Sequence, residues 1–416
     1  MKFAHMADCH LGGWADPVLK EIGLRCFEKA LDLCSEEGVD FIMISGDLFD
    51  SSRPAMEVLE RAVEGMKKTR DRGIRIYIIE GSHDFSPTGR TITRVLEKTG
   101  LFTRVARDER TKDGKLRLRF TVDQETGAKI TGVAGRPGSL ERTFYQNLDR
   151  DAVSKEDGFK IFMFHSGLEE LKPEEYEKAI FMPISLLPPG CAYYAGGHVH
   201  KSMILGWEGY GKIVYPGPLF PENFRELETA ESGGFYIVTE KNGGVEVEWR
   251  AVKLHEVTTI SIDADDRSSS FIEKELRRQL EEEDVEGKFV LIRIGGRLVT
   301  GSPSDIDFRK VASEQYERGA ILVKKNISKL TAKEYEETEV IIESREGLED
   351  RLIEEHAGMH KLLNLSREQR LDLTKMLLKA LSQEKETDET KADHERRLMQ
   401  AILEITGLGK EWDELA

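Results

Sequence analysis

Side chains that commonly bind metal ions lie in short turns across the first half of the chain. Asp8 and His10 are two residues apart in ADCHLGG, and His198 and His200 have the same spacing in GHVH. In extended backbone this spacing points both side chains of a pair to one side. The full set contains carboxylates and imidazoles but no thiolate: Asp8, His10, Asp47, His165, His198 and His200. This donor set suits Mn²⁺, Fe or Zn²⁺ better than Ca²⁺ or Mg²⁺ alone.

Six strong ligands are too many for one tetrahedral ion. They fit two ions roughly 3.5–4 Å apart, with Asp47 of the GDLFD turn as the bridge between them. Such a pair lowers the pKa of a shared water and clamps a phosphate for in-line attack. Any one of these histidines alone would more often be structural. The ordered set of five turns, however, predicts a binuclear site that hydrolyses phosphate esters.

The elements that must bring these turns together are short apolar strands. Strands are expected at residues 2–6, 40–45, 74–79, 160–164 and 193–195, each just before one of the polar turns. Helical patterns over 18–37 and 54–72 lie between them, and this alternation predicts an α/β layered domain. Sites in open α/β sheets form beyond the carboxyl ends of the strands, so the polar turns should converge.

Three further parts of the chain have different patterns. Alternating strands at 116–122, 235–239 and 245–252 complete a first domain over residues 1–252, with two packed sheets flanked by helices. Residues 253–335 predict a small α+β domain, in which three strands alternate with two helices. A charged linker is expected over 336–364, and a helical region with apolar stripes over 365–416.

Composition limits the classes of function. The 416 residues include 61 Lys and Arg against 77 Asp and Glu, which gives a net charge of −16. This argues against a protein that coats nucleic acid with its whole surface, although a local basic groove remains compatible. No apolar run approaches the ~18 residues of a membrane span. Four cysteines without a CxxC pair predict a reducing, cytoplasmic compartment. No GxxxxGK[ST] motif occurs, so any ATP dependence must come from a partner.

The turns ADCHLGG, SGDLFDSSRP and GSHDFSP, with His165 and GHVH, resemble those of the calcineurin-like binuclear metallophosphoesterase superfamily. Within it they are most similar to the SbcD-type (Mre-eleven) DNA double-strand-break repair nucleases. The motifs cover residues 1 to about 220, and the order of domains extends the resemblance to about 335. It implies an α/β/β/α sandwich with an α+β DNA-capping domain. It also implies Mn-dependent endonuclease and exonuclease activity on double-strand break ends.

The same resemblance implies cofactors, partners and a location. Each chain would bind two Mn²⁺ and form a homodimer. The C-terminal helices would grip an SbcC-type (Rad-fifty) ABC ATPase in a repair complex that works on double-stranded DNA ends. The protein would be cytoplasmic, prokaryotic and nucleoid-associated, with no membrane partner.

The resemblance also assigns roles to residues. Asp8, His10 and His200 would hold the first ion, His165 and His198 the second, and Asp47 would bridge them. His83 would stabilise or protonate the leaving oxygen, and Asp84 would orient His83. Ser82 occupies a position where most superfamily members have a metal-binding Asn, and a hydroxyl is a poorer neutral ligand. DNA phosphates would be held by residues that flank the catalytic turns: Arg53, Phe85, Ser86 and Arg90.

Alternatives remain at three points. The site would also suit another metallophosphatase or phosphodiesterase, or a DNA-end scaffold whose metal site has weakened at Ser82. The long tail argues against a small substrate, and the complete set of charged and imidazole ligands argues against decay. The apolar stripes over 54–72 and 91–102 either pack on their own sheet or form a two-fold interface. The C-terminal helices, 367–382 and 392–406, either pair with each other or bind the ATPase.

Overall fold

The computed structural model describes residues 1–86, 91–112, 114–173, 176, 179–229, 232–241, 244–332, 367–383 and 391–406. The chain forms two compact units, residues 1–333 and 334–416. The first unit holds the predicted first domain and the α+β domain. The predicted linker, 336–364, lies outside the described residues.

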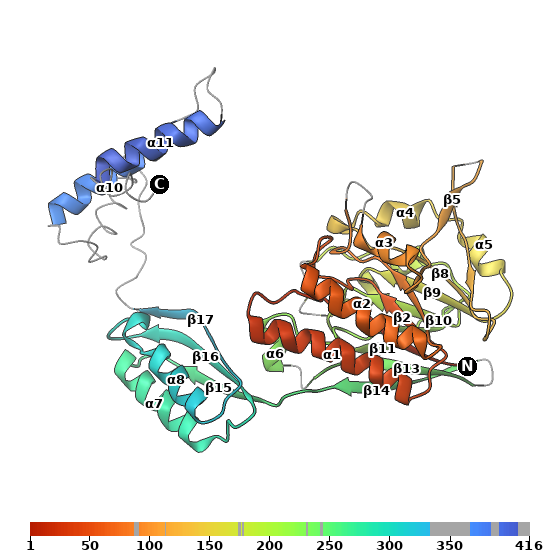
Figure 1. Ribbon diagram of the computed structural model, residues 1–416, viewed down its shortest axis with the longest axis horizontal. Helices are drawn as coiled ribbons and strands as arrows, with labels where there is room; N and C mark the ends of the chain where they lie inside the picture. The colour runs from red at the N-terminus through yellow and green to blue at the C-terminus, as the bar shows by residue number, and fades with distance from the viewer. Residues whose placement is uncertain are drawn as a thin grey trace. The chain divides into compact units, whose positions relative to one another are not determined.

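A six-stranded sheet forms one inner layer of the first domain (Figure 1). Its strands, in spatial order, are β14 (Gly244–Val252), β13 (Gly233–Lys241), β1 (Lys2–Met6), β2 (Phe41–Ser45), β3 (Arg75–Ile79) and β4 (Thr103–Arg104). Strands β1 to β4 are parallel, and β13 pairs with β1 antiparallel. The helices α1 (Pro17–Glu36) and α2 (Met56–Asp71) cover the outer face, where Ile42 packs with Phe27 and Met66. Coverage of both faces explains why β2 is wholly buried and apolar up to its last residue, Ser45.

A second six-stranded sheet packs on the first. Its strands, in spatial order, are β11 (Met203–Leu205), β12 (Lys212–Tyr215), β10 (Tyr193–Gly197), β9 (Lys160–His165), β8 (Lys129–Val133) and β7 (Thr121–Val122). Between the sheets, Phe3 stacks on Phe41 at 5.0 Å and meets Tyr193 edge-on at 5.4 Å. The short helices α4 (Arg142–Gln146) and α5 (Arg150–Lys155) add Tyr145 and Val153 to the core on the outer face. The expected α/β/β/α sandwich is therefore confirmed.

Two local expectations were wrong in their extent. Residues 116–122 form two strands, because β6 (Leu116–Leu118) pairs with β5 (Asp108–Arg110) in a hairpin while β7 joins the second sheet. The helical stretch expected over 91–102 is α3 (Ile92–Lys98). Thr91 caps its start by accepting a hydrogen bond from the Arg94 backbone N–H, and Gly100, with φ of 72°, follows its end.

Residues 257–332 build a parallel sheet of β15 (Val257–Asp263), β16 (Phe289–Leu298) and β17 (Leu322–Ala332). The helices α7 (Ser269–Glu282) and α8 (Phe308–Glu317) pack on it through a separate apolar core that includes Leu276, Ile292 and Val311. The predicted boundary at 252/253 falls in the connection between β14 and β15. We call residues 253–332 the α+β module.

The second unit contains α10 (Arg367–Leu381) and α11 (Lys391–Thr406), which contact each other. Apolar side chains on them remain exposed at Met376, Leu378, Leu381 and Met399. Among the described residues, none of the helices has the length and apolarity needed to cross a membrane.

Candidate metal centre

Strand ends from both sheets bring the predicted ligands together. Asp8 and Asp47 follow β1 and β2 of the first sheet, and His165 ends β9 of the second. The Asp47 Oδ2 atom lies 3.0 Å from His165 Nε2 and 3.7 Å from His10 Nε2. Three overlapping groups each have ligand atoms within 4.8 Å of one another: Asp8, His10 and His200; Asp8, Asp47 and His165; and His10, Asp50 and His83. This arrangement suits divalent metal ions.

Two other predicted ligands lie at the edge of these groups. The backbone N–H of His198 donates to Asp8 Oδ1 at 2.9 Å, and its ring centroid is 5.3 Å from that of His165. The Ser82 hydroxyl donates to Asp47 Oδ2 at 3.3 Å. Ser82 is thus next to the proposed bridging carboxylate, and its role as a ligand stays a prediction.

The backbone is strained where it presents these ligands. Five described residues other than glycine have positive φ, and four of them are Asp8, His10, Asp47 and His198, with φ between 39° and 83°. Each such conformation costs of the order of 1–3 kcal/mol and persists only where the surroundings impose it. Such strain clusters at functional sites, and here it coincides with the predicted metal ligands.

Three glycines lie directly against the candidate ligands or their neighbouring backbone. The sequence motifs gave these glycines no role in the site. A Cβ atom at Gly46 would lie 2.1 Å from His165 Nδ1, and one at Gly81 would lie 2.2 Å from Asp47 Oδ1. A Cβ atom at Gly197 would lie 2.0 Å from the Ser45 carbonyl oxygen. The available signal was their place in the GD, GS and GGH turns. These positions need glycine because a ligand side chain, or at Gly197 the Ser45 backbone, lies too near to allow a Cβ atom.

We therefore expect Gly81→Ala to lower metal affinity by displacing the Asp47 carboxylate. A loss of roughly 10–100-fold, the range for disturbing ligand support, is the expected size. Isothermal titration with Mn²⁺ measures it. Gly206→Ala is the matched control, because a Cβ there meets no atom within 4 Å. Equal affinity in both variants would contradict the close packing at Gly81.

The imidazole rings are oriented through their Nδ1 atoms. His165 Nδ1–H donates to the Ser45 carbonyl at 2.8 Å, and His200 Nδ1 lies 3.2 Å from Glu226 Oε1. His10 Nδ1 forms a hydrogen bond with Asp50 Oδ1 at 3.2 Å and also lies 2.8 Å from Glu222 Oε1. The Nε2 atoms of His10 and His165 are buried and have no hydrogen-bond partner among the described residues. Buried ring nitrogens left open in this way fit a metal ion. Sequence reasoning missed Glu222 and Glu226.

Charge coupling within the cluster is strong. Burial alone would raise the pKa of Asp47, but the positive charge of His165 holds it below its usual range. Burial alone would lower the pKa of His165, but Asp47 raises it to about 10. Burial and the charge of His165 lower the pKa of His198 to about 4, so its ring is neutral at pH 7. Without metal, Asp47 and His165 therefore carry opposite charges 3.0 Å apart in the buried cluster, and a metal ion bound there would displace the His165 proton.

His83 and Asp84 are neighbours in sequence but make different kinds of contact. The His83 ring is half exposed, and its Nδ1–H donates to the Asp50 carbonyl at 2.8 Å. Asp84 is buried and accepts hydrogen bonds from the backbone N–H groups of Leu48, Phe49 and Gly81. Burial, with the charge of Asp47, raises the pKa of Asp84 to about 7. Asp84 therefore stabilises the loop backbone. The His83 ring is held by Asp50, a residue that the sequence motifs did not single out.

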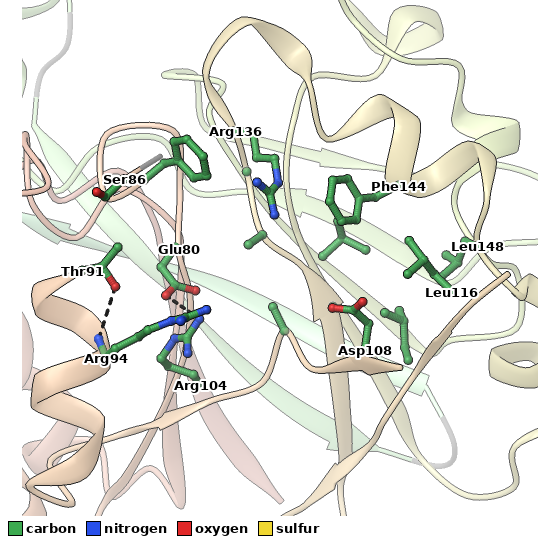
Figure 2. A pocket seen from close by; sticks show the side chains of 17 residues that line it. Glu80, Ser86, Thr91, Arg94, Arg104, Asp108, Leu116, Arg136, Phe144 and Leu148 are labelled. Atoms are coloured by element: carbon green, nitrogen blue, oxygen red, sulfur yellow. Dashed lines mark hydrogen bonds and ion pairs between the residues drawn. The ribbon is translucent and has the colours of Figure 1, made fainter. Parts of the chain in front are cut away.

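A cleft of about 630 Å³ opens over the metal centre and is lined by Ser82, His83, His165 and His198. Arg136 lines this cleft and also a neighbouring cavity of about 250 Å³, shown in Figure 2. Its guanidinium lies 5.0 Å from the Phe85 ring and 4.4 Å from the Phe144 ring.

The predicted DNA contacts are spread over these two spaces. Phe85 and Ser86 line the neighbouring cavity. Arg53 is exposed beside Ser51 and Ser52, which line the cleft. Arg90 lies outside the described residues.

The first domain is similar to proteins of known families. Residues 1–202 match the family model of the calcineurin-like phosphoesterases. The DNA double-strand break repair protein Mre11 of Methanopyrus kandleri is 28% identical over 336 residues, which cover 76% of this chain and 68% of that protein. The Archaeoglobus fulgidus protein of the same name is 26% identical over 313 residues, covering 70% and 67%. A crystal structure of a dimetal phosphatase from Danio rerio has a TM-score of 0.40 at 13% identity, covering 61% of this chain and 96% of that one.

Proposed function

Residues 1–202 belong to the calcineurin-like phosphoesterases, and from this premise we propose that the chain is a Mn²⁺-dependent DNA endonuclease and exonuclease. The same match makes the chain a phosphodiesterase hydrolase. Its substrate would be the end of a double-strand break. The observation that supports this most is the position of Asp47, within 3.7 Å of His10 and 3.0 Å of His165. The name shared by the two archaeal relatives, a DNA double-strand break repair protein, supports the choice of DNA.

Each residue of the site would have its own role in the reaction. Asp8, His10 and His200 would hold one ion, His165 and His198 the other, and Asp47 both. When bound, two such ions supply a water of low pKa and a clamp for phosphate oxygens. His83 faces the open cleft with Nδ1–H bound to the Asp50 carbonyl, which leaves Nε2 to donate a proton to the leaving oxygen. Asp84 keeps the two loops that carry Asp47 and His83 in place.

We also propose that the DNA strand enters over the cleft beside Arg53 and passes Arg136, Phe85 and Ser86. Arg136 places a positive charge beside the Phe85 and Phe144 rings. Grooves that bind single strands combine positive charge with aromatic side chains on which unpaired bases stack. Such local contacts are needed because the whole chain carries a net charge of −16.

One experiment tests the function directly. The purified chain is incubated with Mn²⁺ and linear duplex DNA, and in parallel with p-nitrophenyl phosphate. We expect degradation of the DNA and little hydrolysis of the monoester. Hydrolysis of the monoester alone would favour a small-substrate phosphatase. Binding of DNA ends without hydrolysis of either substrate would favour a scaffold.

We further propose that α10 and α11 bind an SbcC-type (Rad-fifty) ABC ATPase. The two helices contact each other, as the alternative interpretation of their stripes expected. Met376, Leu378 and Met399 nevertheless remain exposed and offer an apolar surface to a partner helix. Homodimer formation would use α2 and α3, where Met56 is 77% and Val95 is 56% exposed. The repair complex would work in the cytoplasm, at the nucleoid.

Deleting residues 365–416 is expected to abolish co-purification with the ATPase and to leave Mn²⁺-dependent cleavage of short DNA intact. The reason is that the catalytic residues all lie in the separate unit 1–333. Charged substitutions at Met376 and Met399 should weaken the complex by ~2 kcal/mol or more, as changes at interface hot spots do. Full ATPase binding by the truncated chain would exclude this role.

A further inference from the structure

The short segment 221–229 contacts two of the metal-binding histidines. It contains α6 (Phe224–Thr229). Glu222 and Glu226 of this segment face the Nδ1 atoms of His10 and His200, at 2.8 and 3.2 Å. The Glu226 carboxylate is held in turn, since it accepts hydrogen bonds from the Glu222 backbone N–H at 2.9 Å and from Asn223 Nδ2 at 2.6 Å. His200 therefore takes its Nδ1 partner from this segment, and His10 lies between Glu222 of the segment and Asp50, which binds the same nitrogen at 3.2 Å.

The same segment is held from its other side by the α+β module. Arg293 of β16 binds Glu228 through two nitrogens, Nε at 2.7 Å and Nη2 at 2.5 Å from the carboxylate. Its guanidinium also lies 5.2 Å from the Phe224 ring. Leu227 is buried in an apolar cluster that includes Leu291 and Leu322 of the module. Bidentate pairs of this kind are strong and geometrically specific.

A second contact supports the start of the segment. The Trp14 indole N–H donates to the Pro221 carbonyl at 2.8 Å. Lys324 of β17 lies 5.1 Å from the Trp14 ring, and its Nζ is 3.4 Å from Asp16 Oδ2. Neighbouring strands of the module thus contact both ends of segment 221–229, directly or through Trp14.

We propose that the α+β module sets the affinity of the first metal ion by holding α6, and that Glu222 and Glu226 are the positioning residues through which it acts. Carboxylates that bind the second nitrogen of a metal-binding imidazole fix its tautomer and ring orientation. Release of Arg293 from Glu228 would free α6. The His200 ring would then lose its fixed partner, and the His10 ring would keep Asp50 but lose the neighbouring Glu222 carboxylate. The position of the module is thereby coupled to metal loading. This inference rests on the proposed metal centre.

The test measures Mn²⁺ binding to the full chain by isothermal titration. Glu222→Gln and Glu226→Gln should each weaken the first ion by roughly 10–100-fold, the range for such supporting contacts. Arg293→Gln and Glu228→Gln should weaken it by roughly tenfold, since the carboxylates remain but are less fixed. The exchanged pair, Arg293→Glu with Glu228→Arg, should restore affinity.

Arg277→Gln is the matched control, because Arg277 binds Glu273 and Glu314 within the module and lies away from α6. It should leave Mn²⁺ affinity unchanged. In the metal-free chain, the ¹⁵N shifts of the His10 and His200 rings provide a second measurement. They should change in Arg293→Gln and not in Arg277→Gln.

Wild-type Mn²⁺ affinity in both Arg293→Gln and Glu228→Gln would overturn the coupling. It would also be overturned if Arg277→Gln lost as much Mn²⁺ affinity as these two variants. A wild-type chain that binds no Mn²⁺ would instead overturn the metal centre and this inference with it. The two failures are therefore distinguishable in one series of titrations.

Discussion

Replacing Asp47 with alanine is expected to abolish DNA cleavage and to remove both metal ions from the chain. Its carboxylate lies between the two groups of ligands, close to His10 on one side and His165 on the other. The same carboxylate accepts hydrogen bonds from the His83 backbone N–H at 2.8 Å and from Ser82. Its loss would therefore remove the proposed ligand of both ions and also an anchor of the loop that carries His83.

Metal content and cleavage of linear duplex DNA measure the result in the purified variant. Asp123→Ala separates loss of metal from loss of stability, because Asp123 is equally buried but binds Arg75 and Tyr77, remote from the metal groups. That control should lower the melting temperature and keep the ions. Two ions in Asp47→Ala, located by anomalous scattering, would contradict the bridging role.

The convergence of the candidate ligands could be predicted from sequence because each lies at the end of a short apolar strand or within four residues after it. Strand β1 spans the predicted 2–6, and His165 stands at the last position of β9. Parallel strands carry such residues to one edge whatever the details of packing. The two-sheet arrangement could be predicted for a similar reason, since buried strands between helices need cover on both faces.

The supporting residues could not be predicted, because their roles depend on contacts between distant segments. Glu222 and Glu226 lie more than 200 residues from His10, on a loop and a helix with no motif. Asp84 lies next to His83 in sequence, yet its carboxylate accepts from the backbone of Leu48, Phe49 and Gly81. Local patterns identify which residues can bind a metal, whereas only the fold shows which ones orient them.

His83→Gln is expected to leave metal binding nearly intact and to slow DNA cleavage by ~10²–10⁴-fold, the range for loss of a general acid. Glutamine can keep a hydrogen bond to the Asp50 carbonyl, which His83 Nδ1 now contacts at 2.8 Å. It has no titratable nitrogen, however, and cannot protonate the leaving oxygen.

Substrates with different leaving groups distinguish proton donation by His83 from simple contact of His83 with the phosphate. A deoxyribose alkoxide needs a proton as it departs, whereas p-nitrophenolate departs as a stable anion. If His83 is the acid, His83→Gln should cleave a p-nitrophenyl ester of thymidine monophosphate at nearly the wild-type rate while failing on duplex DNA. An equal loss on both substrates would assign His83 to stabilisation of the phosphate. Loss of metal ions would instead make His83 a ligand, together with His10 and Asp50, whose potential ligand atoms lie within 4.8 Å of its own.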